Sequence, residues 1–550
     1  MFRPIFFDVI KKYSKKTFFT DLTAGIIVAI VALPLAIAFA IASGVPPQMG
    51  LITAVVIGFF VSLLGGSRFQ IGGPSSAYIV VIYGIAQQFG LQGVVVASLM
   101  AGVILLVMGL IRAGTVIQFM PYPIIVGFTS GIALIIFTSQ MQDFWGIPGN
   151  DLPAEPVGKW MYYFRHLAEV NFVEGAMGIL TVAITVLWPR IYKKIPGSLV
   201  AIILITLLSG LLGLNLETIG SRFGSFSASF QLASFAGVDM ELIQQLIVPA
   251  FTLAMLGAIE SLLSAIVADG VTGYRHRPNT ELIGQGVANI LSPLLGGMGG
   301  SGALAKTMTN IRNGGKTPMA GMLHATILII FSMFLGRLAM MIPLTTLAGV
   351  LVVVAYNMSE WRSFKNIMRS SRGEATVLLT TFLLTIFIGL NFAIPFGIIL
   401  AMILFIRRVM ETSNIEVLQN EVEDERSHIS DDSETREIPN GVEVFQIKGP
   451  FFFGIANKFE EAEQEIHEIP KVRIIRMRRV PFIDSTGLKN LRNFYERSER
   501  HNTHIILSGV TEKVLQALKK EGFYDDIGED NICPDIESAL ERSKTRINED

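Results

Sequence analysis

The sequence has little charge and almost no cysteine. Charged residues make up 16% of its 550 residues, whereas soluble domains average about 25%. The single cysteine, Cys533, excludes an intrachain disulfide. No Walker-type phosphate loop, metal-ligand cluster or catalytic triad is visible along the chain. We therefore expect no enzyme activity, no cofactor, no bound metal and no nucleic-acid partner.

The charge that is present is unevenly distributed. Residues 1–412 carry 25 Lys and Arg against 16 Asp and Glu, whereas residues 413–550 carry 19 against 29. The first part is therefore net +9 and the tail net −10, in a chain that is 51% hydrophobic overall. Such a change in composition indicates a change of solvent near residue 412. We expect a transmembrane domain at 1–412, an acidic linker at 413–437 and a soluble domain at 438–550.

Long apolar segments dominate the first part. A bilayer core of about 30 Å needs roughly 20 apolar residues per helix, and open backbone is not tolerated against lipid. Fourteen apolar segments are visible, some of them shorter than a full span, which predicts an α-helical membrane protein with 14 transmembrane segments. They are 20–42, 50–66, 74–89, 92–112, 118–140, 172–188, 197–213, 243–269, 280–295, 302–312, 319–336, 338–356, 375–389 and 391–410.

The positions of the basic residues test this count. With the N-terminus inside, the cytoplasmic ends and loops hold 20 Lys and Arg, and the outer loops hold four: Lys159, Arg165, Arg222 and Arg337. This asymmetry follows the positive-inside rule. The basic segment Met1–Lys16 precedes a full-length apolar segment without a cleavage signature. We expect a multi-pass protein of the cell inner (plasma) membrane, surrounded by lipid, with both termini cytoplasmic.

The two halves of the membrane part resemble each other. Ala42–Val45 matches Ala268–Val271 at an offset of 226, Leu63–Gly66 matches Leu294–Gly297, and Gly72–Ser75 matches Gly299–Gly302 at an offset of 227. Two halves of seven helices have opposite orientations because seven is odd. Matching segments in the same order indicate two inverted seven-helix repeats.

The third and tenth segments are short and start with glycines. This pattern is typical of discontinuous helices that begin in mid-membrane. The N-terminal N–H groups and positive dipole ends of two such helices can hold an anion between them. The alternative is that both glycine pairs form ordinary interhelical turns. The anion-site hypothesis selects six residues at these helix starts: Ser75, Ser76, Ser301, Gly302, Ala303 and Lys306.

Individual roles follow from side-chain chemistry. Ser301 can cap the tenth helix, and Lys306 can raise the potential seen by an anion unless it extends to the cytoplasmic interface. Glu260 is the acidic residue that lies well inside an apolar segment, where an unpaired charge costs several kcal/mol. Ser264 follows at i+4 on the same helix face. We assign Glu260 and Ser264 to ion coupling; the alternative for Glu260 is a hydrogen bond between helices.

These segments resemble the SulP family of anion transporters, the sulfate-permease group that includes prestin and pendrin. The resemblance rests on residues 24–51, 73–78, 255–269 and 302–321 and covers nearly the whole chain. It implies core and gate domains, a substrate site between the third and tenth half-helices, and a homodimer. It also implies that Glu260 and Lys306 occupy the family's acidic and basic positions at that site.

The tail alternates strand and helix patterns. Strands are predicted at 442–448, 451–455, 472–477 and 504–508, and helices at 458–469, 485–500, 512–521 and 535–544. The segment Val480–Leu488 (VPFIDSTGL) resembles the signature of STAS domains, with Asp484, Ser485 and Gly487 matching. In the related anti-sigma-factor antagonists this serine is phosphorylated; the alternative for Ser485 is a helix N-cap. A STAS domain implies a possible cytosolic partner.

The function expected from these features is secondary active transport of a small anion: sulfate, bicarbonate or a dicarboxylate. A proton is preferred over sodium as the coupling ion, because the sodium-coupled bicarbonate branch of the family has aspartate at the position of Glu260 and threonine at that of Leu304. The alternatives are a sodium-coupled bicarbonate transporter and a channel-like or voltage-responsive anion protein.

Overall fold

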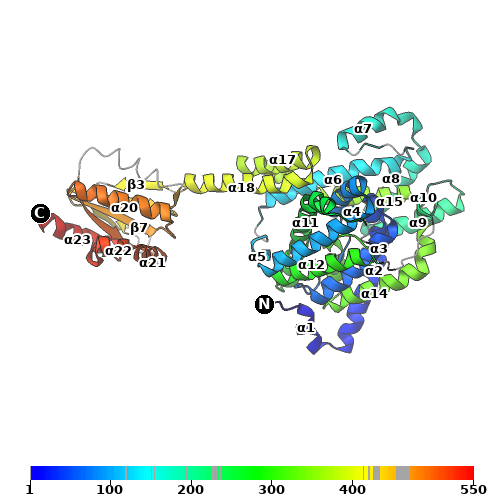
Figure 1. Cartoon of the computed structure of the whole chain (residues 1–550), viewed down its shortest axis with the longest axis horizontal. Helices are drawn as coiled ribbons and strands as arrows, with labels where there is room; N and C mark the ends of the chain where they lie inside the picture. Colours follow the sequence, from blue (N-terminus) through cyan, green and yellow to red (C-terminus); the bar gives the residue numbers. More distant parts are fainter. Residues whose placement is uncertain are drawn as a thin grey trace. The chain divides into compact units, whose positions relative to one another are not determined.

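The chain folds into two compact units, Met1–Ala401 and Met402–Asp550. The computed structural model describes residues 2–117, 120–149, 152–153, 155–192, 195–224, 230, 232–234, 237–412, 414–418, 421–424, 434–453 and 470–549. Each unit is considered by itself below, with the elements labelled in Figure 1.

The first unit is built from helices. The longer ones are α2 (Lys15–Ala42), α3 (Pro47–Leu64), α4 (Ser76–Leu110), α6 (Tyr122–Trp145), α8 (Phe172–Ile191), α9 (Gly197–Leu211), α11 (Met240–Thr272), α12 (Pro278–Leu294), α14 (Met319–Ala339), α15 (Leu344–Met358), α17 (Arg372–Phe387) and α18 (Leu390–Thr412). The shorter ones are α1 (Ile5–Val9), α5 (Gly114–Ile117), α7 (Pro156–Arg165), α10 (Ile219–Phe223), α13 (Leu304–Arg312) and α16 (Trp361–Met368).

Every apolar segment selected from the sequence coincides with a helix. The third and fourth segments are two parts of α4, which breaks at Gly90 (φ 66°). Eight helical stretches within the described residues are long and apolar enough to cross a bilayer, and Gly197–Leu211 and Met319–Phe334 are shorter apolar helices. The helix positions therefore agree with the sequence pattern, while the count of fourteen crossings stays a prediction.

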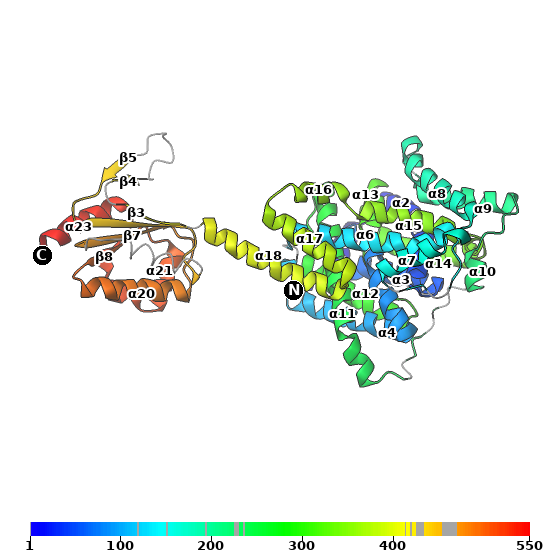
Figure 2. The same cartoon turned by 90° about the horizontal axis from the view of Figure 1, so that it is seen from above.

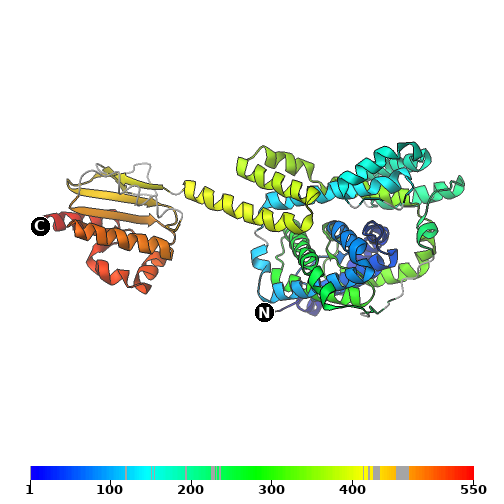
Figure 3. The same cartoon turned by 45° about the horizontal axis from the view of Figure 1, so that its top comes forward.

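The helices pack in two groups. The first, here called the core group, contains α2, α3, α4, α11, α12, α13 and α14; the second, the gate group, contains α6, α8, α9, α15 and α17. Figure 2 and Figure 3 show the groups from two further directions; in Figure 3 the blue and green helices of the core group lie below the cyan and yellow-green helices of the gate group. Both groups are held by apolar side chains that are buried between helices.

The second unit is a small α/β fold around a five-stranded sheet. The strand order is β3 (Asn414–Leu418), β6 (Val442–Lys448), β7 (Val472–Arg479), β8 (His504–Ser508) and β9 (Ile532–Cys533). β3 is antiparallel to β6 and the other pairs are parallel. The helices are α20 (Ser485–Arg500), α21 (Glu512–Lys520), α22 (Phe523–Ile527) and α23 (Ile536–Glu549).

Side chains that alternate along β6 and β7 fill two cores, one on each face of the sheet. Phe445 and Ile475 pack with Phe494 of α20 in the first core. Val444 and Ile474 pack with Leu540 of α23 in the second. Strands of a sheet that is covered on both faces are buried at successive positions, as Val442–Ile447 is, although Glu443 and Gln446 interrupt its hydrophobic residues.

The segment predicted as a linker contains paired strands. β3 extends the sheet, and β4 (Glu421–Asp424) pairs with β5 (Glu434–Glu437). Ile415 and Val417 pack against the first core. They alternate with the polar residues Asn414 and Glu416, a pattern that the acidic composition of the segment obscured in the sequence. The strand predicted at 451–455 is limited, within the described residues, to a bridge between Phe451 and Ile483. The helix predicted at 458–469 lies outside the described residues.

Candidate functional site

The two glycine-led segments meet at the centre of the core group. β1 (Gly72–Gly73) and β2 (Ser301–Gly302) pair antiparallel, with Gly72 opposite Gly302 and Gly73 opposite Ser301. Each two-residue strand is followed directly by a helix, α4 or α13. The N-terminus of α4 is capped by Ser75, whose hydroxyl accepts the Ala77 N–H at 3.3 Å. The alternative of ordinary interhelical turns does not account for this pairing.

Glycine is required where the two backbones cross. A Cβ added to Gly300 would overlap the carbonyl group of Gly73. Gly73 itself has a φ of 147°, a backbone conformation that residues other than glycine rarely adopt. The glycines therefore permit the close backbone approach that brings the two helix starts together.

Glu260 of α11 lies between the two helix starts. Its Oε2 atom accepts hydrogen bonds from the hydroxyl of Ser75 and from that of Ser301, the second at 2.5 Å. Lys306 is 98% buried, and its ammonium group donates to the Pro74 carbonyl oxygen at 3.4 Å. The structure thus brings together a carboxyl group, two hydroxyl groups, an ammonium group and two helix N-termini.

Two expectations about single residues need correction. Ser301 does not cap α13: the N-cap is Ala303, which has no side-chain hydrogen bond, because Ser301 is held in β2 and points to Glu260 instead. Lys306 does not extend to the cytoplasmic interface, because its ammonium group is buried beside Pro74.

The remaining candidates lie at the expected helix starts. Gly302 is in β2, and Ser76 is the first residue of α4. The hydroxyl of Ser264 lies 3.3 Å from the Thr307 hydroxyl of α13. Within the described residues, no hydrogen bond joins Ser264 to Glu260. The roles of these residues in substrate binding and ion coupling stay predictions.

Several polar residues that hold the crossing gave no signal in the sequence. The Ser261 hydroxyl accepts the Gly302 N–H, the Ser98 hydroxyl accepts the Gly299 N–H, and the Asn289 amide oxygen accepts the Gly300 N–H, each at 2.9 Å. The amide of Gln70 is buried beside Gly302 and has no hydrogen-bond partner among the described residues. These four residues follow no common local spacing in the sequence, so only the fold identifies them.

A narrow cavity of about 30 Å³ opens beside Glu260. It lies between the core and gate groups, because its walls come from α4, α6, α11 and α18: Ala77, Phe128, Thr129, Glu260, Leu263 and Ile394 are among them. A site at such a boundary changes its exposure when one group moves against the other.

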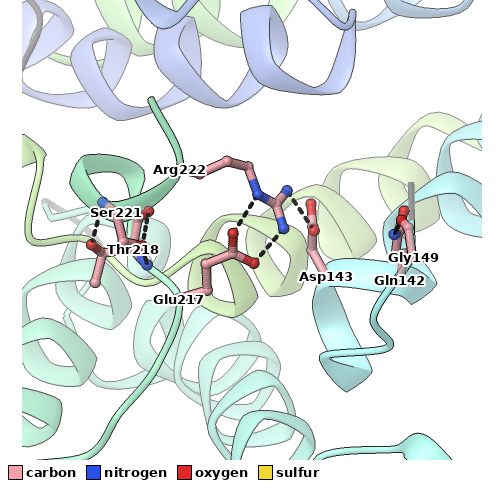
Figure 4. A network of polar contacts seen from close by, with 7 residues as sticks. All are labelled: Gln142, Asp143, Gly149, Glu217, Thr218, Ser221 and Arg222. Carbon is pink, nitrogen blue, oxygen red and sulfur yellow. Dashed lines mark hydrogen bonds and ion pairs between the residues drawn. The ribbon is translucent and has the colours of Figure 1, made fainter. Parts of the chain in front are cut away.

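A second polar cluster lies away from the helix crossing (Figure 4). The guanidinium group of Arg222 donates to both carboxylate oxygens of Glu217, at 2.8 and 2.5 Å, and to Asp143 of α6 at 2.9 Å. Thr218 and Ser221 form a capping box at the start of α10. Both carboxylates are paired with the same guanidinium group, so the cluster ties α10 and the loop before it to α6 and contains no unpaired cation that could hold an anion.

The sequence model described as "Sulfate permease family" matches residues 18–381. The chain belongs to the sulfate permease family. A second model, "STAS domain", matches residues 435–539. This member of the sulfate permease family is 35% identical to the putative sulfate transporter YvdB of Bacillus subtilis, over 95% of this chain and 97% of that one. It is 30% identical to the bicarbonate transporter BicA of Picosynechococcus sp., over 95% and 94% of the two chains.

Solved structures of the family have the same fold. The transmembrane domain of a cyanobacterial bicarbonate transporter BicA aligns with a TM-score of 0.63 at 31% identity, covering 71% of this chain and 98% of that one. The murine Slc26a9 anion transporter in the inward-facing state aligns with a TM-score of 0.82 at 18% identity, covering 98% and 93%. This sulfate permease family member is therefore a multi-pass helical membrane protein with a C-terminal STAS domain.

The STAS signature forms the start of α20. Asp484 is the N-cap, and its carboxylate accepts the Gly487 N–H at 2.8 Å and the Phe453 N–H at 3.2 Å. Ser485 is the first residue of the helix and is exposed. The alternative that Ser485 itself is the N-cap is therefore wrong, because the preceding aspartate takes this position.

Replacing Asp484 with alanine is expected to lower the free energy of unfolding of the soluble fragment 413–550 by about 1 kcal/mol, the usual value of an N-cap. Urea unfolding followed by circular dichroism measures the change. Ser485→Ala is the matched control, since the exposed Ser485 gives no cap. Equal destabilisation by the two substitutions would contradict the assignment of the cap to Asp484.

Proposed function

We propose that this chain is a secondary active transporter that carries small anions by alternating access. The observation that supports this most directly is the position of Glu260 at the boundary between the core and gate groups. Its carboxylate accepts hydrogen bonds from hydroxyl groups at both half-helix starts. Two helix N-termini each present about half a positive charge, and the buried Lys306 adds to the potential.

The anion and the Glu260 carboxylate need the same donors. The hydroxyl groups of Ser75 and Ser301 point to Glu260 in this structure, so an arriving anion competes with the carboxylate for them and is repelled by its charge. A proton on Glu260 removes this repulsion. It also weakens the two hydrogen bonds that the carboxyl group accepts from the serine hydroxyl groups. Proton and anion then favour each other's binding, which is the thermodynamic requirement for symport.

The substrate class is sulfate, bicarbonate or a dicarboxylate. Hydroxyl and N–H donors bind oxyanions in general, and the family members named above are a putative sulfate transporter and a bicarbonate transporter. The experiment is uptake of labelled sulfate, bicarbonate and succinate into proteoliposomes, with an imposed pH or sodium gradient. Absence of saturable uptake for all three anions would contradict the proposal.

Sodium-coupled bicarbonate transport is the second candidate. The likeness to BicA favours it, at 30% identity over nearly the whole chain. The side chain of Leu304 weighs against it, because it is 41% exposed at the start of α13 and offers no oxygen ligand. A channel-like anion protein is the remaining alternative, and unsaturable flux would favour it.

The arrangement in the membrane belongs to the same proposal. We assign the protein to the inner membrane of the cell, with both termini in the cytoplasm. Two chains are expected to form a homodimer. The STAS domain is expected to bind a cytosolic partner. We place the boundary of the soluble part near residue 413 instead of 438, since β3 belongs to its sheet.

A further inference from the structure

A second cavity follows the first along the boundary between α4 and α6. It has a volume of about 440 Å³ and is lined by Ile79 to Gln88 of α4, Ile135 to Ser139 of α6, and Lys159 of α7. The cavity beside Glu260 touches Ala77 of the same helix and Ile124 to Thr129 of α6. At 1.5 Å per helical residue and 3.6 residues per turn, the second cavity lies one to two turns further along α4 and about three turns further along α6, on the side that the distribution of basic residues assigns to the outside.

Lys159 provides the charge of this second cavity. Its side chain is 97% buried, and its ammonium group donates to the Ser139 hydroxyl at 2.8 Å. The ring of Tyr83 lies 4.8 Å from the same nitrogen. Within the described residues the ammonium forms no ion pair with a carboxylate. A buried cation that is satisfied only by a hydroxyl and an aromatic ring retains most of its positive potential.

The other polar groups of the cavity suit an oxyanion. The amides of Gln87 and Gln88 are exposed at its wall, and the hydroxyl group of Ser139 lies beside the ammonium. These groups can donate hydrogen bonds, while carboxylates are absent from the described lining. The volume is ample for sulfate, bicarbonate or succinate together with water.

We infer that this cavity is an outer binding site for small oxyanions, with Lys159 as its charged residue. The site is separate from the helix crossing and holds an anion between α4 and α6 before the core and gate groups rearrange. The claim that this site is part of the transport route rests on the proposed function. The claim that an anion binds at Lys159 is independent of the proposed function.

The first test is equilibrium binding of labelled sulfate and succinate to the purified full-length protein in nanodiscs. Wild type is expected to bind two anions per chain, and Lys159→Met only one, or the second at least tenfold more weakly. Lys159→Arg is expected to bind within threefold of wild type. Arg165→Met is the matched control, because Arg165 is an exposed cation on the same helix α7. Equal binding by Lys159→Met and wild type, or no saturable binding to wild type, would overturn the inference.

The pH dependence provides a readout that a merely structural role would not change. Burial lowers the pKa of Lys159 to about 8, so its charge is lost as the pH rises. The groups around it are Tyr83 from α4, Tyr163 from its own helix and Asp143 from α6, and Asp143 is paired with Arg222. Phenols and an ion-paired carboxylate keep their charge state between pH 7 and 9. The Lys159-dependent affinity is therefore expected to fall about tenfold over this range.

A chemical rescue separates charge from shape. The chain has one cysteine, Cys533, so in a Cys533→Ser background a cysteine placed at 159 is the single thiol and can be modified through the cavity that residue 159 lines. Lys159→Cys treated with an aminoethyl methanethiosulfonate regains an ammonium group and is expected to regain the second anion, whereas the sulfonatoethyl reagent is expected to exclude it. If both reagents act alike, the inference fails. Uptake by wild type is measured separately: Lys159-dependent binding without uptake would contradict the proposed function alone.

Discussion

Replacing Gly302 with valine is expected to abolish uptake of every anion that the wild-type chain carries. Gly302 pairs with Gly72 at the crossing and donates its N–H to the Ser261 hydroxyl. A Cβ at this position would meet the buried amide of Gln70, and the two methyl groups of valine would extend into the space in front of α13. Loss of at least a hundredfold in initial uptake rate is expected, measured with labelled sulfate and bicarbonate in proteoliposomes.

The matched control is Gly270→Val. Gly270 lies near the end of α11, where an added Cβ would have no neighbour within 4 Å. Valine in a helix interior is about a few tenths of a kcal/mol more favourable than glycine, so this variant is expected to transport normally. Both variants are first compared with wild type by size-exclusion chromatography, because the site assignment requires a folded protein. A well-folded Gly302→Val protein with normal uptake would place the anion site elsewhere.

Replacing Glu260 with glutamine is expected to remove the effect of a pH gradient on uptake. The amide keeps the size of the side chain and can still accept a hydrogen bond from Ser75 or Ser301, but it cannot bind and release a proton. Accumulation driven by an inward proton gradient is expected to fall at least tenfold, to the level seen without a gradient. Exchange of internal for external anion is expected to continue, because exchange needs no net movement of protons.

Glu241→Gln provides the control on the same helix. Glu241 lies in the first turn of α11 and is exposed, so its charge is not expected to affect coupling. If wild-type uptake depends on a sodium gradient and not on the pH gradient, the coupling ion is sodium and not a proton. Gradient-driven uptake that persists unchanged in Glu260→Gln would remove Glu260 from the coupling step.

The helices could be predicted from the sequence because lipid imposes a length and a hydrophobicity on every crossing segment. Residues 197–213 and 319–336, for example, are predominantly apolar and contribute α9 and α14. The strand at Asn414–Leu418 could not be predicted, because the polar residues Asn414 and Glu416 alternate with Ile415 and Val417 over only four positions. So short an alternation is compatible with either a strand or a solvated loop until a partner strand is known.

The candidate site could be predicted in part. Glu260 is conspicuous because a carboxyl group within an apolar segment is rare, and the glycines of the half-helices form a pattern that recurs along the chain. Ser261 and Asn289 could not be found, because polar residues that support a backbone from a neighbouring helix follow no local spacing. Lys159 appeared in the sequence only as one outer basic residue among four, and its burial depends on the packing of α7 against α6.

The pairing of Gly73 with Ser301 has a consequence for symmetry. These residues are 228 positions apart, and so are Ser76 and Leu304, the first residues of α4 and α13, one more than the offset read from the glycine motifs. Gly73 and Ser301 therefore occupy equivalent positions in the two repeats and also pair with each other. This requires the pseudo-twofold axis to pass between them. A contact of this kind is isologous, as in a homodimer. The present chain thus contains within itself a self-complementary contact of the kind that two identical chains form across a twofold axis.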